Sequence, residues 1–334
     1  METMFYEKLA NRGVKCGICN HFCKIDNGEK GICRVRENRD GVLNLLVYNK
    51  IIARSIDPIE KKPLYHVLPG SSSYSIAAPG CNFQCLFCQN ADIAQMPREK
   101  GIIRGVAIKP EDIVSQALLA GCATIAYTYT EPTVYFELAF ETAELAGKNN
   151  LLNVFVTNGY MSGTVLEKIA PYLDAANVDL KSFSSRFYGK YCKAGIQPVK
   201  DNLKYMKALG IIVEVTTLLI PGLNDSREEL EKLAQFIQEE LGPETPWHIS
   251  RFHPCHRMTD HMATPGKSLE NAYRIGKDAG LYHVYAGNAP MLGLENTYCH
   301  ACGAILVKRT GYNIDSRINK GKCPDCAAQI HGIY

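Results

Sequence analysis

Three cysteines stand close together in one short stretch, Cys81-Asn82-Phe83-Gln84-Cys85-Leu86-Phe87-Cys88. The CxxxCxxC spacing closes a loop after an apolar run, and Pro79-Gly80 turns the chain into that loop. Three thiolates at this spacing can hold one [4Fe–4S] cluster, and since no fourth cysteine is near, one iron keeps a coordination position for a small molecule. Phe83 and Phe87 would shield the cluster from water. A zinc knuckle is disfavoured, because zinc motifs prefer paired CxxC units.

A second group of four cysteines precedes this loop: Cys16, Cys19, Cys23 and Cys33. Gly17, Gly28 and Gly31 permit the tight turns that a metal knuckle needs. Four thiolates suit either a closed structural zinc site or an additional iron–sulfur cluster, and the spacing does not decide between the two. Reduced cysteines in a loop-rich cap are the alternative to metal binding.

A third group ends the chain: Cys299, Cys302, Cys323 and Cys326 form two CxxC units separated by a 20-residue segment. Paired CxxC units at this separation predict a zinc-ribbon or rubredoxin-like site. The ligand set suits Zn²⁺ or mononuclear iron. With four thiolates in each, the first and last groups are predicted to be closed sites that support folding or pass electrons.

Predicted strands and helices alternate along the chain between the first and the last cysteine groups. Strand-like apolar runs are predicted at 74–78, 124–127, 152–156, 175–179, 211–218 and 247–251, with a further run at 283–286. Helical patterns occupy 110–120, 134–148, 163–173, 199–209 and 226–241. This alternation predicts an α/β fold with a parallel sheet. Before it, segments 42–48 and 51–56 are predicted to pair as a hairpin across Asn49-Lys50.

Composition fits an ordinary globular enzyme. Of the 334 residues, 46% are hydrophobic and 21% charged, and the net charge of +3 is too small to argue for nucleic acid. No secretory or membrane-spanning segment is evident, so we expect a cytoplasmic protein without a membrane partner. Fourteen cysteines in the reducing cytosol indicate metal sites in place of disulfides.

The three-cysteine loop resembles the cluster loop of the radical S-adenosylmethionine (radical SAM) superfamily, and the six β/α units match its partial (β/α)₆ barrel. From Cys16 onward the chain resembles the radical SAM component of the AmmeMemoRadiSam system, including the segments 36–38 and 57–63. The expected organisation is an N-terminal Cys-rich module and hairpin (1–72), the barrel (73–290) and a C-terminal four-Cys module (291–334).

The resemblance also implies a SAM pocket at the strand ends. Segments 157–159 and 179–181 resemble those that line SAM in glycyl-radical-enzyme activases such as pyruvate formate-lyase activating enzyme. Pro221-Gly222 is expected near the adenine. Glu131 stands where the superfamily has Gly-Gly-Glu, which holds the SAM amino group, although it also suits a helix N-cap. The candidate SAM-binding residues are Glu131, Thr157, Asn158, Asp179, Lys181 and His253.

The implied reaction is reductive cleavage of SAM to methionine and a 5′-deoxyadenosyl radical, with an electron supplied by flavodoxin or ferredoxin. The radical would abstract hydrogen from a glycyl residue of a partner enzyme, or alternatively modify RNA or a small metabolite. Memo-like and AMMECR-like proteins are candidate partners, and nucleic acid is disfavoured. A non-catalytic iron–sulfur electron carrier would need a closed cluster. Cys192 is read as a buried spectator or a substrate-side thiol.

Overall fold

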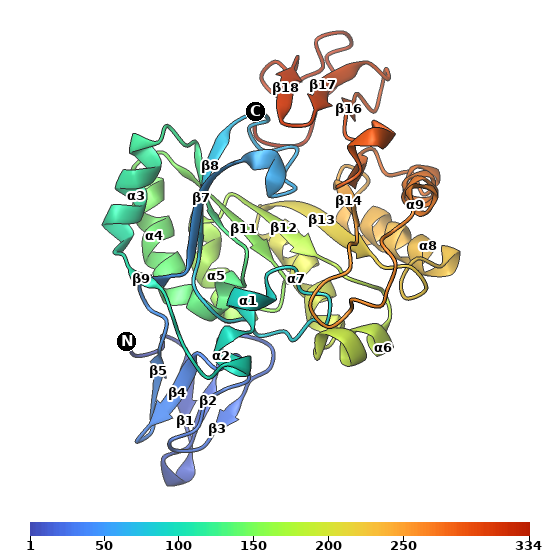
Figure 1. Ribbon diagram of the computed structural model, residues 1–334. Helices are drawn as coiled ribbons and strands as arrows, with labels where there is room; N and C mark the ends of the chain where they lie inside the picture. Colours follow the sequence, from blue (N-terminus) through green and yellow to red (C-terminus); the bar gives the residue numbers. More distant parts are fainter. The chain divides into compact units, whose positions relative to one another are not determined.

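The computed structural model describes residues 1–334, apart from the side chain of Pro290 (Figure 1). Two compact units divide the chain. Unit 1 comprises Met1–Asp57 and Ser72–Asp174, and unit 2 comprises Pro58–Ser71 and Ala175–Tyr334. No helix in the described part of the chain is long and apolar enough to cross a membrane.

Unit 1 contains a run of neighbouring strands in the order β11-β10-β8-β7. β10 lies between β8 and β11 and is parallel to both, with Ala126 opposite Ser75 on one side and Val154 on the other. The strands β8, β10 and β11 are almost fully buried, as is typical of a parallel sheet, whereas β7 is mostly exposed. The strands are β7 (Ala53–Pro58), β8 (Ser72–Ala77), β10 (Thr124–Tyr127) and β11 (Leu152–Thr157).

The three predicted helices of unit 1 form as α3, α4 and α5, the last ending at Ile169, whereas the short η1, α1 and α2 were not predicted. α3 begins with Pro110, whose fixed φ suits a first helical turn, and α5 is capped by Ser162, whose Oγ accepts from the Val165 N–H. The helices α3 and α4 lie against each other (Figure 1). The set consists of η1 (Ala10–Arg12), α1 (Ala91–Ala94), α2 (Met96–Glu99), α3 (Pro110–Leu119), η3 (Pro132–Tyr135), α4 (Phe136–Lys148), α5 (Gly163–Ile169) and η4 (Ala170–Tyr172).

The predicted hairpin of segments 42–48 and 51–56 is wrong. β5 (Val42–Leu45) pairs with the preceding β4 (Arg36–Arg39). The turn between them is Asp40-Gly41, both with positive φ, which is the backbone that a two-residue type I′ hairpin requires. The strand that follows, β6 (Lys50–Ile51), pairs instead with β9 (Val106–Ala107). A smaller antiparallel sheet joins β1 (Tyr6–Lys8), β2 (Val14–Cys16) and β3 (Lys24–Ile25).

Unit 2 contains a second run of parallel strands, in the order β15-β14-β13-β12. The strands are β12 (Ala175–Asp179), β13 (Ile212–Leu219), β14 (Trp247–Arg251) and β15 (Val284–Gly287), so the last apolar run does add a strand. Together with unit 1 they confirm the α/β class and the mostly parallel pairing. The connecting helices are η2 (Ile59–Lys61), α6 (Ser185–Phe187), η5 (Tyr188–Cys192), α7 (Gln197–Ala208), α8 (Arg227–Phe236), η6 (Ile237–Leu241), α9 (Gly266–Asp278) and η7 (Pro290–Leu292).

The helix α9 is not among the predicted helices. It begins at Gly266, and the residue before it, Pro265, offers no side-chain cap, so the sequence lacks the usual start signal. Its apolar face is nevertheless buried through Leu269 and Ala272. Tertiary packing therefore forms this helix where local signals are weak.

The C-terminal part of unit 2 is a small antiparallel sheet of β16 (Thr297–Tyr298), β17 (Ile305–Thr310) and β18 (Asn313–Ser316). Its hydrophobic core is limited to five buried residues, two of them cysteines. They are Cys299, Leu306, Val307, Cys323 and Ile330. So small an apolar core needs a further bond or ligand to hold such a sheet.

A buried polar network lies at the beginning of the unit 2 strands, away from the strand ends where chemistry is expected. The Glu214 carboxylate on β13 accepts from the backbone N–H groups of Tyr65 and His66 and from His248 Nε2 on β14. Arg309 of β17 donates to the Tyr65 carbonyl and to Thr297. These contacts fix the C-terminal sheet to the segment 58–71, which is a structural role.

Candidate functional site

The three-cysteine loop follows β8 directly. Phe83 and Phe87 are buried, as the shielding role predicted. Cys81 Sγ accepts a hydrogen bond from the Phe83 N–H at 3.4 Å, and Gln95 Nε2 donates to the Phe83 carbonyl at 3.0 Å. Backbone N–H groups that donate to a cysteine sulfur are a feature of iron–sulfur sites and help set their potential.

The chemistry of Cys81 fits a metal ligand. Burial raises the pKa of its thiol well above the ordinary value, and the carboxylate of Glu131 and the neighbouring Cys85 and Cys88 raise it further. A bound cation reverses this situation, since a coordinating thiol is deprotonated outright. Three thiols with buried aromatic neighbours and N–H donors therefore suit a [4Fe–4S] cluster, which Cys81, Cys85 and Cys88 would hold.

Gly80 explains how closely this loop is packed. Its φ is +111°, and a Cβ at this position would lie 2.7 Å from Val35 Cγ1. Only glycine avoids both the strained backbone and the clash. The loop thus lies directly against the segment that carries Cys33, whose carbonyl oxygen is 3.6 Å from the same Cβ position.

Asn158, at the end of β11, contacts the cluster loop. Its Nδ2 donates to Asn82 Oδ1 at 2.7 Å and lies 3.8 Å from Cys81 Sγ. Its Oδ1 accepts from the Tyr160 N–H, which fixes the amide orientation. Thr157 precedes it, and both are buried. The strand-end segment 157–159 is therefore adjacent to the cluster loop, as a SAM pocket requires.

Glu131 is buried and surrounded by protein donors. One carboxylate oxygen accepts from the Thr133 N–H and from Thr157 Oγ1, and the other accepts from the Asn158 N–H at 2.8 Å. Burial raises the pKa of this carboxyl, and these hydrogen bonds oppose the shift. The N-cap interpretation of Glu131 is confirmed. Its carboxylate also joins the ends of β10 and β11, so it orders the backbone at the strand ends.

Tyr129 lies two residues before Glu131, in the segment that resembles Gly-Gly-Glu, and has a φ of +61°. This left-handed backbone is where glycine is usual, which gives a physical reason for glycine at that position. Its carbonyl accepts from Asn90 Nδ2 at 2.8 Å, and its hydroxyl donates to Asp57 Oδ2. These two hydrogen bonds therefore help to stabilise a left-handed backbone conformation that is energetically unfavourable for tyrosine.

The remaining predicted SAM residues lie in unit 2. Lys181 Nζ donates to Asp179 Oδ2 at 2.8 Å at the end of β12, so the expected partnership forms. The two side chains stay 13% and 32% exposed, respectively. His253 follows β14 and is exposed, and Pro221-Gly222 follows β13, with Gly222 in a positive-φ turn. Cys192 is fully buried, which favours a packing role.

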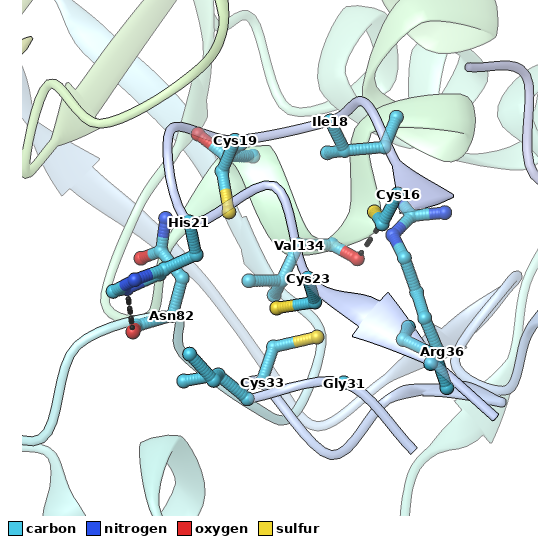
Figure 2. A pocket seen from close by; sticks show the side chains of 13 residues that line it. Cys16, Ile18, Cys19, His21, Cys23, Gly31, Cys33, Arg36, Asn82 and Val134 are labelled. Carbon is cyan, nitrogen blue, oxygen red and sulfur yellow. Dashed lines mark hydrogen bonds between the residues drawn. The ribbon is translucent and has the colours of Figure 1, made fainter. Parts of the chain in front are cut away.

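The N-terminal cysteines line one pocket in unit 1, together with Ile18, Ile25, Val134 and Asn82. Figure 2 shows the sulfurs of Cys19, Cys23 and Cys33 facing the space among them, and Cys16 beside Arg36. Burial raises the pKa of Cys16 to about 11. Loss of these protons would accompany metal binding.

The segment that carries these cysteines is bound to the loop after β11. Asn20 Nδ2 donates to the Met161 carbonyl at 2.7 Å, and Ser162 Oγ donates to the Gly17 carbonyl at 2.6 Å. His21 Nε2 lies 2.9 Å from the Asn82 carbonyl oxygen. The N-terminal cysteines are thus connected to both the cluster loop and the strand-end loop.

Arg36 and Glu137 form an ion pair that sequence reasoning missed. Each guanidinium nitrogen faces one carboxylate oxygen at 2.8 Å, and the side chains are only 2% and 0% exposed. Arg36 Nη1 also donates to Thr3 Oγ1. Alternation of buried and exposed positions in β4 is the signal that places Arg36 inward, but its partner lies 101 positions away.

The C-terminal cysteines form a compact group. The four sulfurs of Cys299, Cys302, Cys323 and Cys326 lie within 4.8 Å of one another. Two sulfur pairs are separated by 3.6 Å and 3.7 Å. A tetrahedral ion with metal–sulfur bonds of about 2.3 Å separates its sulfurs by about 3.8 Å. This group therefore has the dimensions of a mononuclear four-thiolate site, as the paired CxxC units predicted.

We expect Cys323→Ser to lower the thermal midpoint of unfolding and the yield of soluble protein, because the small sheet depends on its metal. Metal analysis should find one zinc or iron fewer per chain than in the wild type. Cys255→Ser, which changes a cysteine outside all three groups, is the control and should keep both properties. An unchanged metal content in Cys323→Ser would contradict a four-thiolate site.

Comparison with known proteins agrees with this site. The model of the radical SAM superfamily matches residues 75–237, which include the cluster loop and the strand ends from β10 to β13. The chain belongs to the radical SAM superfamily. Members hold a [4Fe–4S] cluster and SAM, which is the pair of cofactors that the residues of the loop suit.

Particular relatives are informative to different degrees. The chain is 44% identical to the uncharacterized protein MJ0808 of Methanocaldococcus jannaschii, over 98% of both chains. It is 23% identical to the pyruvate formate-lyase-activating enzyme of Clostridium pasteurianum, over 48% of this chain and 66% of that enzyme. A radical SAM methyltransferase structure from Sphaerobacter thermophilus shares the fold, with a TM-score of 0.52, 14% identity and coverage of 71% of each chain.

Proposed function

We propose that the protein cleaves SAM reductively and directs the resulting 5′-deoxyadenosyl radical to a glycyl residue of a partner protein. The observation that carries the proposal is the contact of Asn158, at the end of β11, with Asn82 and Cys81 of the cluster loop. When bound, the [4Fe–4S] cluster supplies the electron that breaks the carbon–sulfur bond of SAM. A one-electron carrier such as flavodoxin or ferredoxin is the proposed donor.

The protein residues bind, orient and shield. Cys81, Cys85 and Cys88 would hold the cluster, and Phe83 and Phe87 would keep water from it. Glu131 fixes the backbone at the ends of β10 and β11, where carbonyl groups can accept from the SAM ammonium group. Thr157, Asn158, Asp179, Lys181 and His253 are the further residues that we propose contact SAM. Residues 73–290 are proposed to form the partial (β/α)₆ barrel, between the module 1–72 and a zinc-ribbon or rubredoxin-like module 291–334.

The glycyl target is supported by the strand-end segments that resemble the activases and by the similarity to a pyruvate formate-lyase-activating enzyme. Such an enzyme acts on a protein, so the proposed substrate is a protein backbone. Memo-like and AMMECR-like proteins are proposed partners on the resemblance of the whole chain. RNA or a small metabolite is the competing substrate.

Isotope transfer tests the substrate class. Protein, RNA and small-molecule fractions from cells grown on deuterated glycine would be incubated separately with enzyme, reductant and unlabelled SAM. We expect deuterium in the released 5′-deoxyadenosine only with the protein fraction, and protease treatment should remove the effect. Transfer from the RNA or small-molecule fraction alone would reject the glycyl target while leaving SAM cleavage intact.

Asp179→Asn should weaken SAM binding, because Asp179 and Lys181 present a partly exposed ion pair at the end of β12. Loss of one charge-assisted hydrogen bond costs about 1.5–3 kcal/mol, or roughly a 10- to 150-fold rise in the dissociation constant. Isothermal titration with SAM under anaerobic conditions measures it. Asp278→Asn, at the exposed end of α9, is the matched control. Equal affinity in both variants would place the pocket elsewhere.

A further inference from the structure

We propose that Cys16, Cys19, Cys23 and Cys33 hold a second iron–sulfur cluster, directly beside the SAM-cluster loop. The first observation is the pocket itself: four thiols from one 18-residue stretch line a single pocket. A single zinc ion brings four sulfurs to within about 3.8 Å of one another. An iron–sulfur cluster places several atoms between its thiolates and so needs a wider arrangement.

The spacing of the sulfurs distinguishes the two kinds of site within this chain. Among the residues that the structure describes, the C-terminal cysteines are the one group of three or more such ligands within 4.8 Å of one another. No three of the N-terminal cysteine sulfurs lie that close together. The same holds for Cys81, Cys85 and Cys88, which stand at the positions of the [4Fe–4S] ligands of the superfamily. The N-terminal group therefore resembles the cluster loop and differs from the mononuclear site.

A buried amide supplies an independent observation. Asn82 lines the same pocket and is 1% exposed, and its Nδ2 has no hydrogen-bond partner. Its Oδ1, in contrast, accepts from Asn158 Nδ2 at 2.7 Å, which fixes the orientation of the amide. An N–H donor left unpaired in the interior destabilises the fold. Sulfide and thiolate sulfurs of a cluster are acceptors that would satisfy it.

The side chains that line the pocket also suit an iron–sulfur cluster. Ile18, Ile25 and Val134 are buried or nearly so and provide an apolar surround, which limits access of water to an oxygen-sensitive cluster. The charge of Arg36 in the wall is matched by Glu137. Asn82 lines this pocket and directly follows Cys81, which would hold the SAM cluster. The two clusters would therefore be neighbours.

Acid-labile sulfide is the readout that separates the possibilities, since mononuclear zinc or iron sites contain none. The test uses a full-length Cys81→Ser/Cys85→Ser/Cys88→Ser variant reconstituted anaerobically with iron and sulfide. We expect two or four sulfides per chain, corresponding to a [2Fe–2S] or a [4Fe–4S] cluster, with the same number of irons in addition to any iron at the C-terminal mononuclear site. Adding Cys19→Ser and Cys33→Ser should remove that sulfide, whereas adding Cys122→Ser should not.

A second measurement keeps the proposal testable if the multiple variants fold poorly. In reduced wild-type protein, two neighbouring paramagnetic clusters should broaden each other's EPR signals, and Cys33→Ser should leave one unbroadened signal. The proposal would be overturned if the reconstituted triple variant contained no acid-labile sulfide. It would also be overturned if the wild type contained one cluster and two zinc ions per chain. Neither readout involves SAM, so failure here is distinct from failure of the proposed SAM cleavage.

Discussion

Cys88→Ser should abolish release of 5′-deoxyadenosine from SAM and dithionite, whereas wild-type protein should release it slowly without any substrate. The loss is complete because the electron from dithionite would reach SAM only through the cluster, and two thiolates are too few to hold that cluster. Cys81→Ser and Cys85→Ser should behave in the same way. Chromatography with mass detection measures the product, with iron content determined on the same samples.

The matched control is Cys122→Ser, which changes a buried cysteine that belongs to none of the three groups. It should keep wild-type iron content and product release. Substantial 5′-deoxyadenosine from a Cys88→Ser protein that lacks the cluster would contradict the assignment of this loop. Loss of activity in Cys122→Ser would indicate general sensitivity to cysteine replacement.

Arg36→Met should lower the free energy of unfolding by about 3–5 kcal/mol, because it leaves the Glu137 carboxylate buried without its cation. The double variant Arg36→Met/Glu137→Leu should recover most of that loss, since replacing both members of a buried pair by apolar residues is often neutral or stabilising. Urea denaturation followed by circular dichroism, with metal content matched, measures both. A double variant no more stable than Arg36→Met would contradict this account of the pair.

The same pair predicts a pH dependence. Burial alone would raise the pKa of Glu137, but Arg36 more than offsets this, so the pKa lies below the ordinary value of 4.5. A carboxyl whose pKa is lower in the folded state contributes stability that is present above its unfolded pKa and is lost as the pH falls through the folded pKa. Wild-type stability should therefore decrease below about pH 4.5 more steeply than that of the double variant.

Much of the α/β part was predictable from local patterns. The strands β10, β12 and β14 have the predicted bounds, because each is a short, largely buried segment of a parallel sheet. The hairpin prediction is wrong because Asp40-Gly41, which adopts positive φ at both residues, forms the turn instead of Asn49-Lys50. The compact C-terminal group was predictable from its paired CxxC spacing. Each CxxC unit forms a local turn, and only one long-range contact is needed to bring the two turns together.

Long-range partnerships were not predictable. Glu131 was expected at the SAM amino group. In the structure its carboxylate accepts hydrogen bonds from Thr157 and Asn158 at the end of the next strand, and these partners are visible only in the folded chain. Similarly, the position of Cys16–Cys33 ahead of the first strand suggested a module apart from the chemistry. The structure instead connects this segment to Asn82 and to the loop after β11.

The central claim is that SAM binds to the open iron of the cluster held by Cys81, Cys85 and Cys88. Electron–nuclear double resonance on the reduced protein tests it directly, with SAM labelled by ¹⁷O in the carboxylate and ¹⁵N in the amino group. The account predicts hyperfine coupling from both labels, present in wild type and in the Cys33→Ser variant. Tight SAM binding without coupling from either label would contradict the claim.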